Sequence, residues 1–286
     1  MNQAVSAPGR YVNVDGVRTH YLEAGLEHKG KRPSVLLLHS AEFGGSAETS
    51  WEFNIESLAA HYHVLAPDHL GFGRTDKIFD FTGQFNRRIN HIRRFIEVMC
   101  VERVHVMGSS MSGGLCLTVA ARKPPDWPIA SVVCCSGGGD APDNEARKIL
   151  NTYDGTREHM RRVIDVMFID KKWVNDEAFV ERRWRMSREP GAWEATAAAR
   201  FKAPFPRDGA PRAERDNISY ANIAAPVLVF AGRLDALRDP GYTDKFAPQI
   251  PNARLHVFEH AGHMGNVECP SEFNRVTLDF LRAIDA

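Results

Sequence analysis

The sequence predicts an α/β fold, in which a mostly parallel central sheet is flanked by helices and interrupted by a helical insertion. Short continuous apolar runs recur along the chain and alternate with stretches of helical periodicity. Strands buried on both faces of a parallel sheet have such runs, and the alternation is typical of βαβ units. One long segment contains no convincing strand, which indicates an insertion. With 43% apolar residues in 286, the chain can bury a large core.

The first two strands are expected to form a hairpin. Residues 11–14 and 19–23 flank Asp15-Gly16, a pair that accepts the positive φ angles of a tight turn. Later apolar runs predict further strands, and helical periodicity between them predicts helices. The expected strands are 34–39, 63–67, 104–107, 129–135, 226–231 and 254–258, and the expected helices are 85–99, 112–122 and 272–284.

Residues 139–206 are predicted to form a helical lid, and residues 1–138 and 207–286 the core. Glycines 137–139 precede the lid, and Pro204, Pro206 and Pro211 lie near its end. Aromatic residues recur there at helical spacings among charged residues, and we expect them to form the lid's own apolar core. They are Phe168, Trp173, Phe179, Trp184, Trp193, Phe201 and Phe205.

Charge and composition exclude several classes of function. Lysine plus arginine total 36, as do aspartate plus glutamate, so a nucleic acid is not expected as a partner. No apolar run approaches the roughly 20 residues that cross a bilayer, so no membrane partner is expected. The five cysteines form no CxxC pair, and the first residues do not resemble a secretory signal. We therefore expect a cytoplasmic protein that acts on a small molecule.

A strand–turn–helix junction carries the candidate nucleophile. An apolar strand runs into Gly108-Ser-Ser-Met-Ser112 and then into a helix. A nucleophile elbow needs this context, with small residues two positions before and after the serine. Gly108 and Ser112 meet that need around Ser110, although serine replaces glycine at the second position. Ser109 would need a small residue where Met107 stands, and Ser112 falls inside the predicted helix, so Ser110 is the predicted nucleophile.

A serine nucleophile needs a base, and the base needs an orienting acid. The order Ser, acid, His accompanies an elbow of this kind. Asp235 follows the strand 226–231, and His263 follows the strand 254–258 in a glycine-bearing loop. Both lie where the carboxyl ends of parallel strands meet. The competing candidates are His260, Asp239 and Asp244. The Gly262-His263 pair and the short distance of Asp235 from its strand favour His263 as base and Asp235 as acid.

An oxyanion hole requires fixed N–H donors close to the nucleophile. The backbone N–H of Met111 is the first expected donor, and that of Ala41, in the loop after the strand 34–39, is the second. His39 is interpreted as a residue that braces this loop. The segment 68–76 is interpreted as a structural loop near the pocket.

These residues resemble the α/β-hydrolases that act on meta-cleavage products, the carbon–carbon bond hydrolases of aromatic degradation. The similarity covers nearly the whole chain and is densest in 36–77, 104–114 and 252–281. Phe273-Asn-Arg in the final helix is more specific than the elbow, which the whole superfamily shares. The resemblance implies the α/β-hydrolase fold, no cofactor and no metal, and a dimer or larger homo-oligomer.

The resemblance also implies a reaction and a set of substrate contacts. The reaction is hydrolysis of a 2-hydroxy-6-oxohexa-2,4-dienoate-type compound to a 2-hydroxypentadienoate and a carboxylic acid. Arg183, next to Trp184 in the lid, is similar to an arginine that binds the dienoate, and a guanidinium suits a planar carboxylate. A lid salt bridge of Arg183 with Glu181 or Glu177 is the structural alternative.

Three departures from the family pattern are expected to face the pocket. The family usually has asparagine where Ser109 stands and tryptophan where Met264 stands. Its glycine-rich loop is here replaced by a segment that contains Ser40 and Glu42. We therefore expect Ser109, Met264, Ser40, Glu42, Arg183 and Trp184 to contact the substrate. A carboxylesterase or lactonase that uses the same triad is the alternative function.

Overall fold

A computed structural model describes residues 7–201 and 217–286. Its centre is an eight-stranded sheet with the order β1-β2-β4-β3-β5-β6-β7-β8. β1 pairs antiparallel with β2, and β2 with β4, whereas all later pairs are parallel. The strands are β1 (Gly9–Val14), β2 (Val17–Ala24), β3 (Ser34–Leu38), β4 (Val64–Pro67), β5 (Val104–Ser109), β6 (Ile129–Cys135), β7 (Val227–Gly232) and β8 (Ala253–Phe258).

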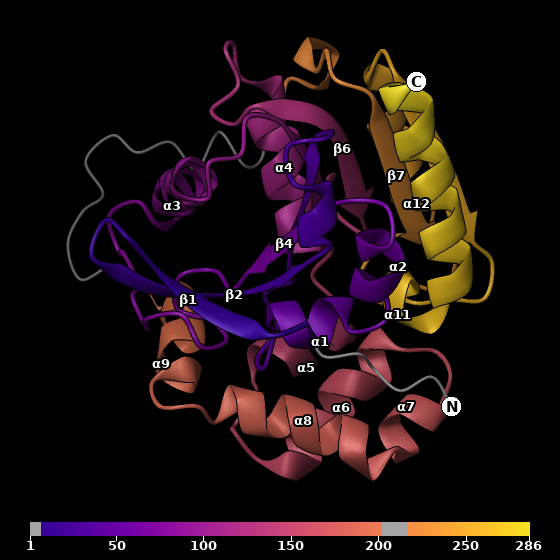
Figure 1. Cartoon of the computed structure of the whole chain (residues 1–286). Coiled ribbons are helices and arrows are strands. Elements are labelled where there is room, and N and C mark those ends of the chain that lie inside the picture. The colour runs from indigo at the N-terminus through magenta and orange to yellow at the C-terminus, as the bar shows by residue number, and fades with distance from the viewer. Residues whose placement is uncertain (1–6, 202–216) are drawn as a thin grey trace.

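Helices cover both faces of this sheet. α3 (Gln84–Val98) and α4 (Met111–Ala121) pack on one face, and α1 (Ala47–Trp51), α2 (Ile55–Ala59) and α12 (Pro270–Asp285) pack on the other. Figure 1 shows α3 and α12 on opposite sides of the sheet. The short helix α11 (Gly265–Glu268) precedes α12. None of the helices in the described part of the chain is long and apolar enough to cross a membrane.

The side chains of β3 explain why the predicted strands are continuous apolar runs. Leu36 and Leu38 join the core beneath α3 and α4, whereas Val35 and Leu37 join the core beneath α1, α2 and α12. Successive side chains of a strand point to opposite faces, so both residue parities must be apolar when both faces are covered. The predicted mostly parallel sheet with flanking helices is confirmed.

The expected hairpin and the longer helices are present within two residues of their predicted bounds. Asp15 and Gly16 have φ angles of 50° and 87°, as a tight turn between β1 and β2 requires. The sequence did not predict α1, α2 and α11, which are four or five residues long. A helix of about one turn is too short to display helical periodicity.

The segment predicted as a lid is helical where the structure describes it. It contains α5 (Glu145–Asn151), α6 (Arg157–Met167), α7 (Lys172–Asn175), α8 (Glu177–Ser187) and α9 (Ala192–Ala197). Figure 1 shows these helices gathered on the side of the core where α1 lies. The predicted end of the lid at residue 206, Phe205 and the three prolines Pro204, Pro206 and Pro211 lie outside the described residues.

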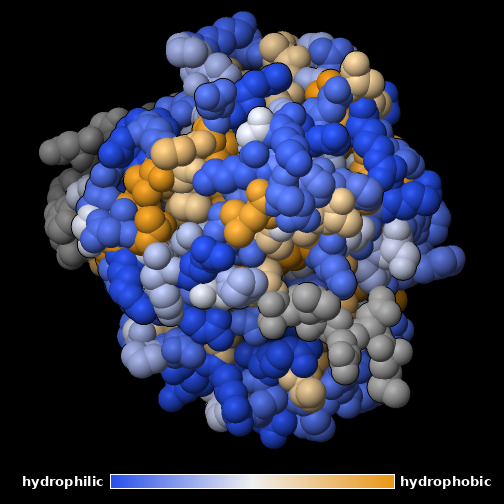
Figure 2. Space-filling model, viewed as in Figure 1, coloured by the Kyte–Doolittle hydropathy of each residue, from blue (hydrophilic) through white to orange (hydrophobic). Residues whose placement is uncertain are grey.

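The aromatic residues of this segment belong to an apolar cluster that also includes Phe43, Leu237, Met264 and Val267 from outside it. Phe168 and Phe179 are buried and pack edge to face, and Trp173, Trp184 and Trp193 are partly buried against the same cluster. Phe201 is the exception among the described aromatics, with 61% of its surface exposed. The face drawn in Figure 2 is accordingly dominated by hydrophilic residues, with apolar residues in small groups between them.

Candidate active site

Ser110 lies at the sharp turn between β5 and α4. Its φ of 54° and ψ of −113° belong to a region that L-residues rarely adopt, so the surrounding structure must enforce them. A Cβ at Gly108 would lie 2.2 Å from the carbonyl oxygen of Ser112, and one at Gly137 would lie 2.7 Å from that of Ser110. The turn is therefore possible only because glycines flank it.

Ser110, His263 and Asp235 form one continuous chain of hydrogen bonds. His263 Nε2 lies 2.7 Å from Ser110 Oγ, and His263 Nδ1 lies 2.7 Å from Asp235 Oδ2. The side chains of His263 and Asp235 are 3% and 1% exposed, and Ser110 is partly exposed. Burial favours a raised pKa for Asp235, but the charge and hydrogen bond of His263 and the Leu237 N–H outweigh it and lower that pKa.

The competing candidates are not part of this chain of hydrogen bonds. His260, Asp239 and Asp244 are all exposed. Ser109 is buried with its hydroxyl 3.8 Å from the sulfur of Met264, and the hydroxyl of Ser112 donates to the carbonyl oxygen of His39. Of the three serines at the elbow, Ser110 is the one bonded to a histidine that an acid orients.

The histidine loop is fastened to the lid. The backbone N–H of His263 donates to the carbonyl oxygen of Met167, 2.9 Å away at the end of α6. The carboxylate of Glu268 accepts the N–H groups of Gly262 and Ile169, each at 2.7 Å. Burial raises the pKa of Glu268, and these N–H donors partly offset that effect. The base is thus held by residues of both the core and the lid.

The loop that contains Ala41 is held at both ends by residues that follow β4. At its start, His39 Nδ1 donates to the carbonyl oxygen of Ser40 at 2.6 Å, and His39 Nε2 accepts the backbone N–H of His69 at 2.9 Å. At its end, the carboxylate of Asp68 accepts the N–H of Ala47 at 2.7 Å. His39 therefore has the geometry of a brace, as the sequence predicts.

Asp68 is the centre of the structural loop 68–76. Besides Ala47, it binds His20 Nδ1 at 2.7 Å and the backbone N–H of Arg74 at 2.8 Å. A Cβ at Gly73 would lie 2.1 Å from its carboxylate, which accounts for the glycine. Burial acts to raise the pKa of Asp68, but the hydrogen bond to His20 and the nearby histidines lower it overall.

The two predicted oxyanion donors are the backbone N–H groups of Met111 and Ala41. Met111 is the first residue of α4, directly after Ser110, and Ala41 lies two residues beyond His39. Neither backbone N–H has a hydrogen-bond partner within the described ranges. Both are thus available to a developing negative charge.

Arg183 is buried in the lid, and its partner is neither Glu181 nor Glu177. Its Nη2 donates to the carbonyl oxygen of Thr49 at 2.7 Å and to Glu52 at 3.1 Å, and its guanidinium lies 3.4 Å from the ring centroid of Phe179. Glu181 and Glu177 instead pair with other lid arginines. Burial lowers the pKa of Arg183, and Glu52 offsets part of this effect. Its Nη1 is buried and has no partner among the described residues.

The other residues predicted to contact the substrate differ in whether they already have partners within the protein. Met264 belongs to the same apolar cluster as the lid aromatics, and the Ser109 hydroxyl faces its sulfur. Ser40 is buried with its hydroxyl 3.1 Å from that of Ser50, whereas Glu42 is partly exposed. The indole N–H of Trp184 donates to the carbonyl oxygen of Gly155, within the lid. Ser40 and Trp184 thus already have protein partners.

The sequence analysis missed a buried amide network that joins the junction of α1 and α2 to α11 and α12. Asn54 donates to the carbonyl oxygen of Asn266 and to Asn274 Oδ1, and Asn266 donates to the carbonyl oxygen of Ser50. Asn274 belongs to the Phe273-Asn-Arg motif and donates to the carbonyl oxygen of Phe53. That motif was the only available signal, since the partners are more than 200 positions apart.

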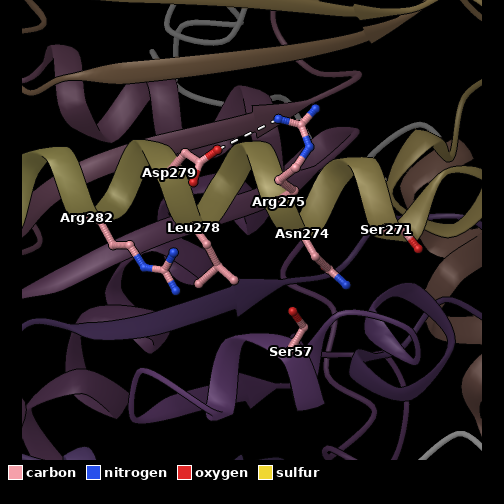
Figure 3. A pocket seen from close by; sticks show the side chains of 7 residues that line it. All are labelled: Ser57, Ser271, Asn274, Arg275, Leu278, Asp279 and Arg282. Carbon is pink, nitrogen blue, oxygen red and sulfur yellow. Dashed lines mark ion pairs between the residues drawn. The ribbon is translucent and has the colours of Figure 1, made fainter.

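A surface pocket of about 390 Å³ lies away from the triad, between α2 and α12. Figure 3 shows side chains of α12 facing Ser57 of α2, with Arg275 paired to Asp279 along the helix. No triad residue lines it. Within the described part of the chain, no group of three His, Cys, Asp or Glu side chains could hold a metal ion.

Comparisons with known proteins show what this chain is similar to. The α/β-hydrolase fold family model matches residues 33–270. The 2-hydroxymuconate semialdehyde hydrolase of Pseudomonas sp. (strain CF600) is 31% identical, over 100% of this chain and 99% of its own. The 2-hydroxy-6-oxo-6-(2'-aminophenyl)hexa-2,4-dienoic acid hydrolase of Metapseudomonas resinovorans is 31% identical, over 95% and 90%. The solved meta-cleavage product hydrolase of Pseudomonas fluorescens IP01 is similar with a TM-score of 0.83 and 26% identity, over 96% and 98%.

Proposed function

This chain belongs to the α/β-hydrolase family and, within it, to the meta-cleavage product hydrolases, and we propose that it hydrolyses a carbon–carbon bond in a 2-hydroxy-6-oxohexa-2,4-dienoate. The observation that carries this proposal is the chain of two 2.7 Å hydrogen bonds through Ser110, His263 and Asp235. Such an arrangement activates a hydroxyl at neutral pH, because the imidazole accepts its proton and the carboxylate stabilises the imidazolium.

The reaction begins when the dienol form of the substrate becomes its keto tautomer, which makes the later leaving group an enolate. Ser110, or a water that His263 activates, then attacks the C6 carbonyl, and His263 takes the proton. The new negative charge develops on the C6 oxygen, and we assign the N–H groups of Ala41 and Met111 to stabilise it. These two donors lower the barrier because they are already oriented before the reaction.

The tetrahedral intermediate collapses by breaking the bond between C5 and C6. The electron pair moves into the C1–C5 fragment, which leaves as a vinylogous carbanion and takes up a proton as 2-hydroxypentadienoate. Water then releases the C6 fragment from Ser110 as a carboxylic acid, with His263 as base. One water is consumed overall. No oxidant or cofactor enters this balance.

Arg183 is proposed to bind the C1 carboxylate through its free Nη1. The support is a buried guanidinium with one unpaired N–H donor group. A desolvated guanidinium gains more from a planar carboxylate than an exposed one does. We assign Ser109 and Met264 to the pocket wall, together with Ser40, Glu42 and Trp184. Residues 139–206 act as the lid in this scheme.

The proposal extends to the cellular setting. All five cysteines are free, and Cys116, Cys134 and Cys135 are buried with pKa values raised by burial. Unpaired thiols, three of them buried, fit a reducing compartment, and we assign the protein to the cytoplasm. A dimer or larger homo-oligomer follows from the resemblance, and light scattering of the purified protein tests it.

The test is the absorbance decay of a panel of dienoates that carry methyl or phenyl at C6. Wild type is expected to bleach at least one of them, and Ser110→Ala is expected to lose the activity. Bleaching that persists in the Ser110→Ala variant would refute the proposed role of Ser110. A wild type that bleaches no dienoate would refute the proposed substrate class.

An esterase or lactonase is the second candidate. Ser109 and Met264, which touch each other beside the triad, are the observation that favours it. The same enzyme preparations should be given p-nitrophenyl acetate. Strong ester turnover without dienoate bleaching would assign the triad to ester hydrolysis.

A further inference from the structure

Three residues from separate segments form a closed ring of hydrogen bonds through their side chains and backbone groups. His39 directly follows β3, His69 follows β4, and Ser112 lies in the first turn of α4. The backbone N–H of His69 donates to His39 Nε2 at 2.9 Å, His69 Nε2 lies 2.8 Å from Ser112 Oγ, and Ser112 Oγ donates to the carbonyl oxygen of His39 at 2.5 Å. All three residues are 0% exposed.

Every hydrogen in this ring has one consistent position. His39 Nε2 accepts a hydrogen bond, so the proton of this ring sits on Nδ1 and is donated to the carbonyl oxygen of Ser40. Ser112 uses its own proton toward His39, so it accepts the Nε2 proton of His69. Burial lowers the pKa of both imidazoles, which keeps them neutral. The ring is therefore a fixed polar structure.

The ring joins the two segments that carry the oxyanion donors. Ser112 directly follows Met111, and His39 lies two residues before Ala41. An elbow usually has glycine at the position of Ser112. Glycine has no hydroxyl, so the bond from α4 to the carbonyl oxygen of His39 and the acceptor for His69 exist here because the residue is serine.

We propose that Ser112, oriented by His69, is a positioning residue that fixes the separation between the N–H donors of Ala41 and Met111. This inference rests on the proposed role of Ser110 as nucleophile. Preorganised donors stabilise the transition state only when they are held where the charge develops. Ser112 touches neither the substrate nor the reacting atoms in this scheme, and it acts through the backbone at both ends of the ring.

The test compares Ser112→Ala and Ser112→Gly with Thr118→Ala. Thr118 is a matched control, because it is also a buried hydroxyl of α4 but donates within its own helix, to the carbonyl oxygen of Gly114 at 2.9 Å. A misplacement of catalytic groups by about 1 Å can cost about 100-fold, so both Ser112 variants are expected to lower kcat about 10- to 100-fold with little change in KM. Thr118→Ala is expected to keep wild-type kcat.

A second readout does not depend on the substrate class. A fluorophosphonate probe transfers its phosphonyl group to Ser110 and releases fluoride, and its phosphoryl oxygen occupies the oxyanion hole during attack. The labelling rate is expected to fall in both Ser112 variants in parallel with kcat. Labelling of wild type without dienoate turnover would refute the proposed substrate and leave this test intact.

His69→Ala breaks the same ring from the other side. Its loss in labelling rate is expected not to add to that of Ser112→Ala, because residues of one network are coupled. The proposal is overturned if Ser112→Ala and Ser112→Gly label and turn over like wild type. It is equally overturned if their losses match that of Thr118→Ala, or if the His69 and Ser112 effects are additive.

Discussion

Replacing Asp235 by asparagine tests the acid of the triad and has a calculable cost. The Asp235 carboxylate lies 2.7 Å from His263 Nδ1, and its side chain is 1% exposed. When His263 takes the proton of Ser110, an ion pair forms with a charge separation of roughly 4 Å, worth about 4 kcal/mol at an effective dielectric constant of about 20. Asparagine keeps the shape and removes this attraction.

A loss of about 4 kcal/mol corresponds to about 10³-fold in rate. The asparagine amide can also stabilise the wrong tautomer of His263, so the expected loss in kcat for Asp235→Asn is about 10³- to 10⁴-fold. KM should change little, because the lost interaction strengthens only in the transition state. The assay is dienoate bleaching under saturating substrate, with p-nitrophenyl acetate as a second substrate.

Asp239→Asn is the matched control for this experiment. Asp239 is exposed and lies in the same loop, so its replacement should leave kcat unchanged. Circular dichroism and Tm establish that the Asp235 variant is folded. A folded Asp235→Asn variant whose kcat is within about tenfold of wild type would contradict the assignment of the acid. Its loss would then be much smaller than the electrostatic energy of the ion pair.

Two further predictions concern Arg183 and Asp68. Arg183→Lys keeps the charge but loses the planar fork and the stack on Phe179, so KM for the dienoate should rise about tenfold, while KM for p-nitrophenyl acetate, which has no carboxylate, should not change. Glu52→Gln is the control, because it removes the ion-pair partner and leaves the guanidinium in place; it should lower Tm and leave KM unchanged. If Arg183→Lys and wild type have equal KM values for the dienoate, Arg183 does not bind its carboxylate. Asp68 has a lowered pKa, so its contribution to stability is present above its unfolded value near 3.8 and is lost as pH falls through the lower folded value. Asp68→Asn should lower the free energy of unfolding at pH 7 by about 3–5 kcal/mol, measured by urea titration. It should also make the free energy of unfolding less dependent on pH below about 4. If that pH dependence is the same in the variant as in wild type, Asp68 is not the group responsible.

The sheet and the triad were predictable from the sequence for physical reasons. Strands such as β3 are buried on both faces, so their apolar runs are continuous and easily recognised. Ser110, Asp235 and His263 each follow a recognised strand in the expected order, and the carboxyl ends of parallel strands bring such loops together. Local pattern and topology together therefore predict these three positions.

Other parts of the site depend on contacts that no local pattern records. Arg183 pairs with Glu52, 131 positions away, and not with the neighbouring glutamates that helical spacing suggested. Asn54 and Asn266 are 212 positions apart. The role of the Ser112 hydroxyl is also not visible in the sequence, where Ser112 is only a departure from the glycine of the elbow motif. Its partners become apparent only when β3 and β4 end beside α4.

The backbone contacts between the histidine loop and the lid limit how the two parts can be exchanged. The carbonyl oxygen of Met167 receives the N–H of His263, and the N–H of Ile169 shares the Glu268 carboxylate with Gly262. A chimera that takes residues 139–206 from a relative would import half of each contact. A chimera that preserves the register of 167–169 is expected to keep these contacts, whereas a one-residue shift there is expected to break them. Residues 139–206 and the histidine loop are therefore best exchanged together.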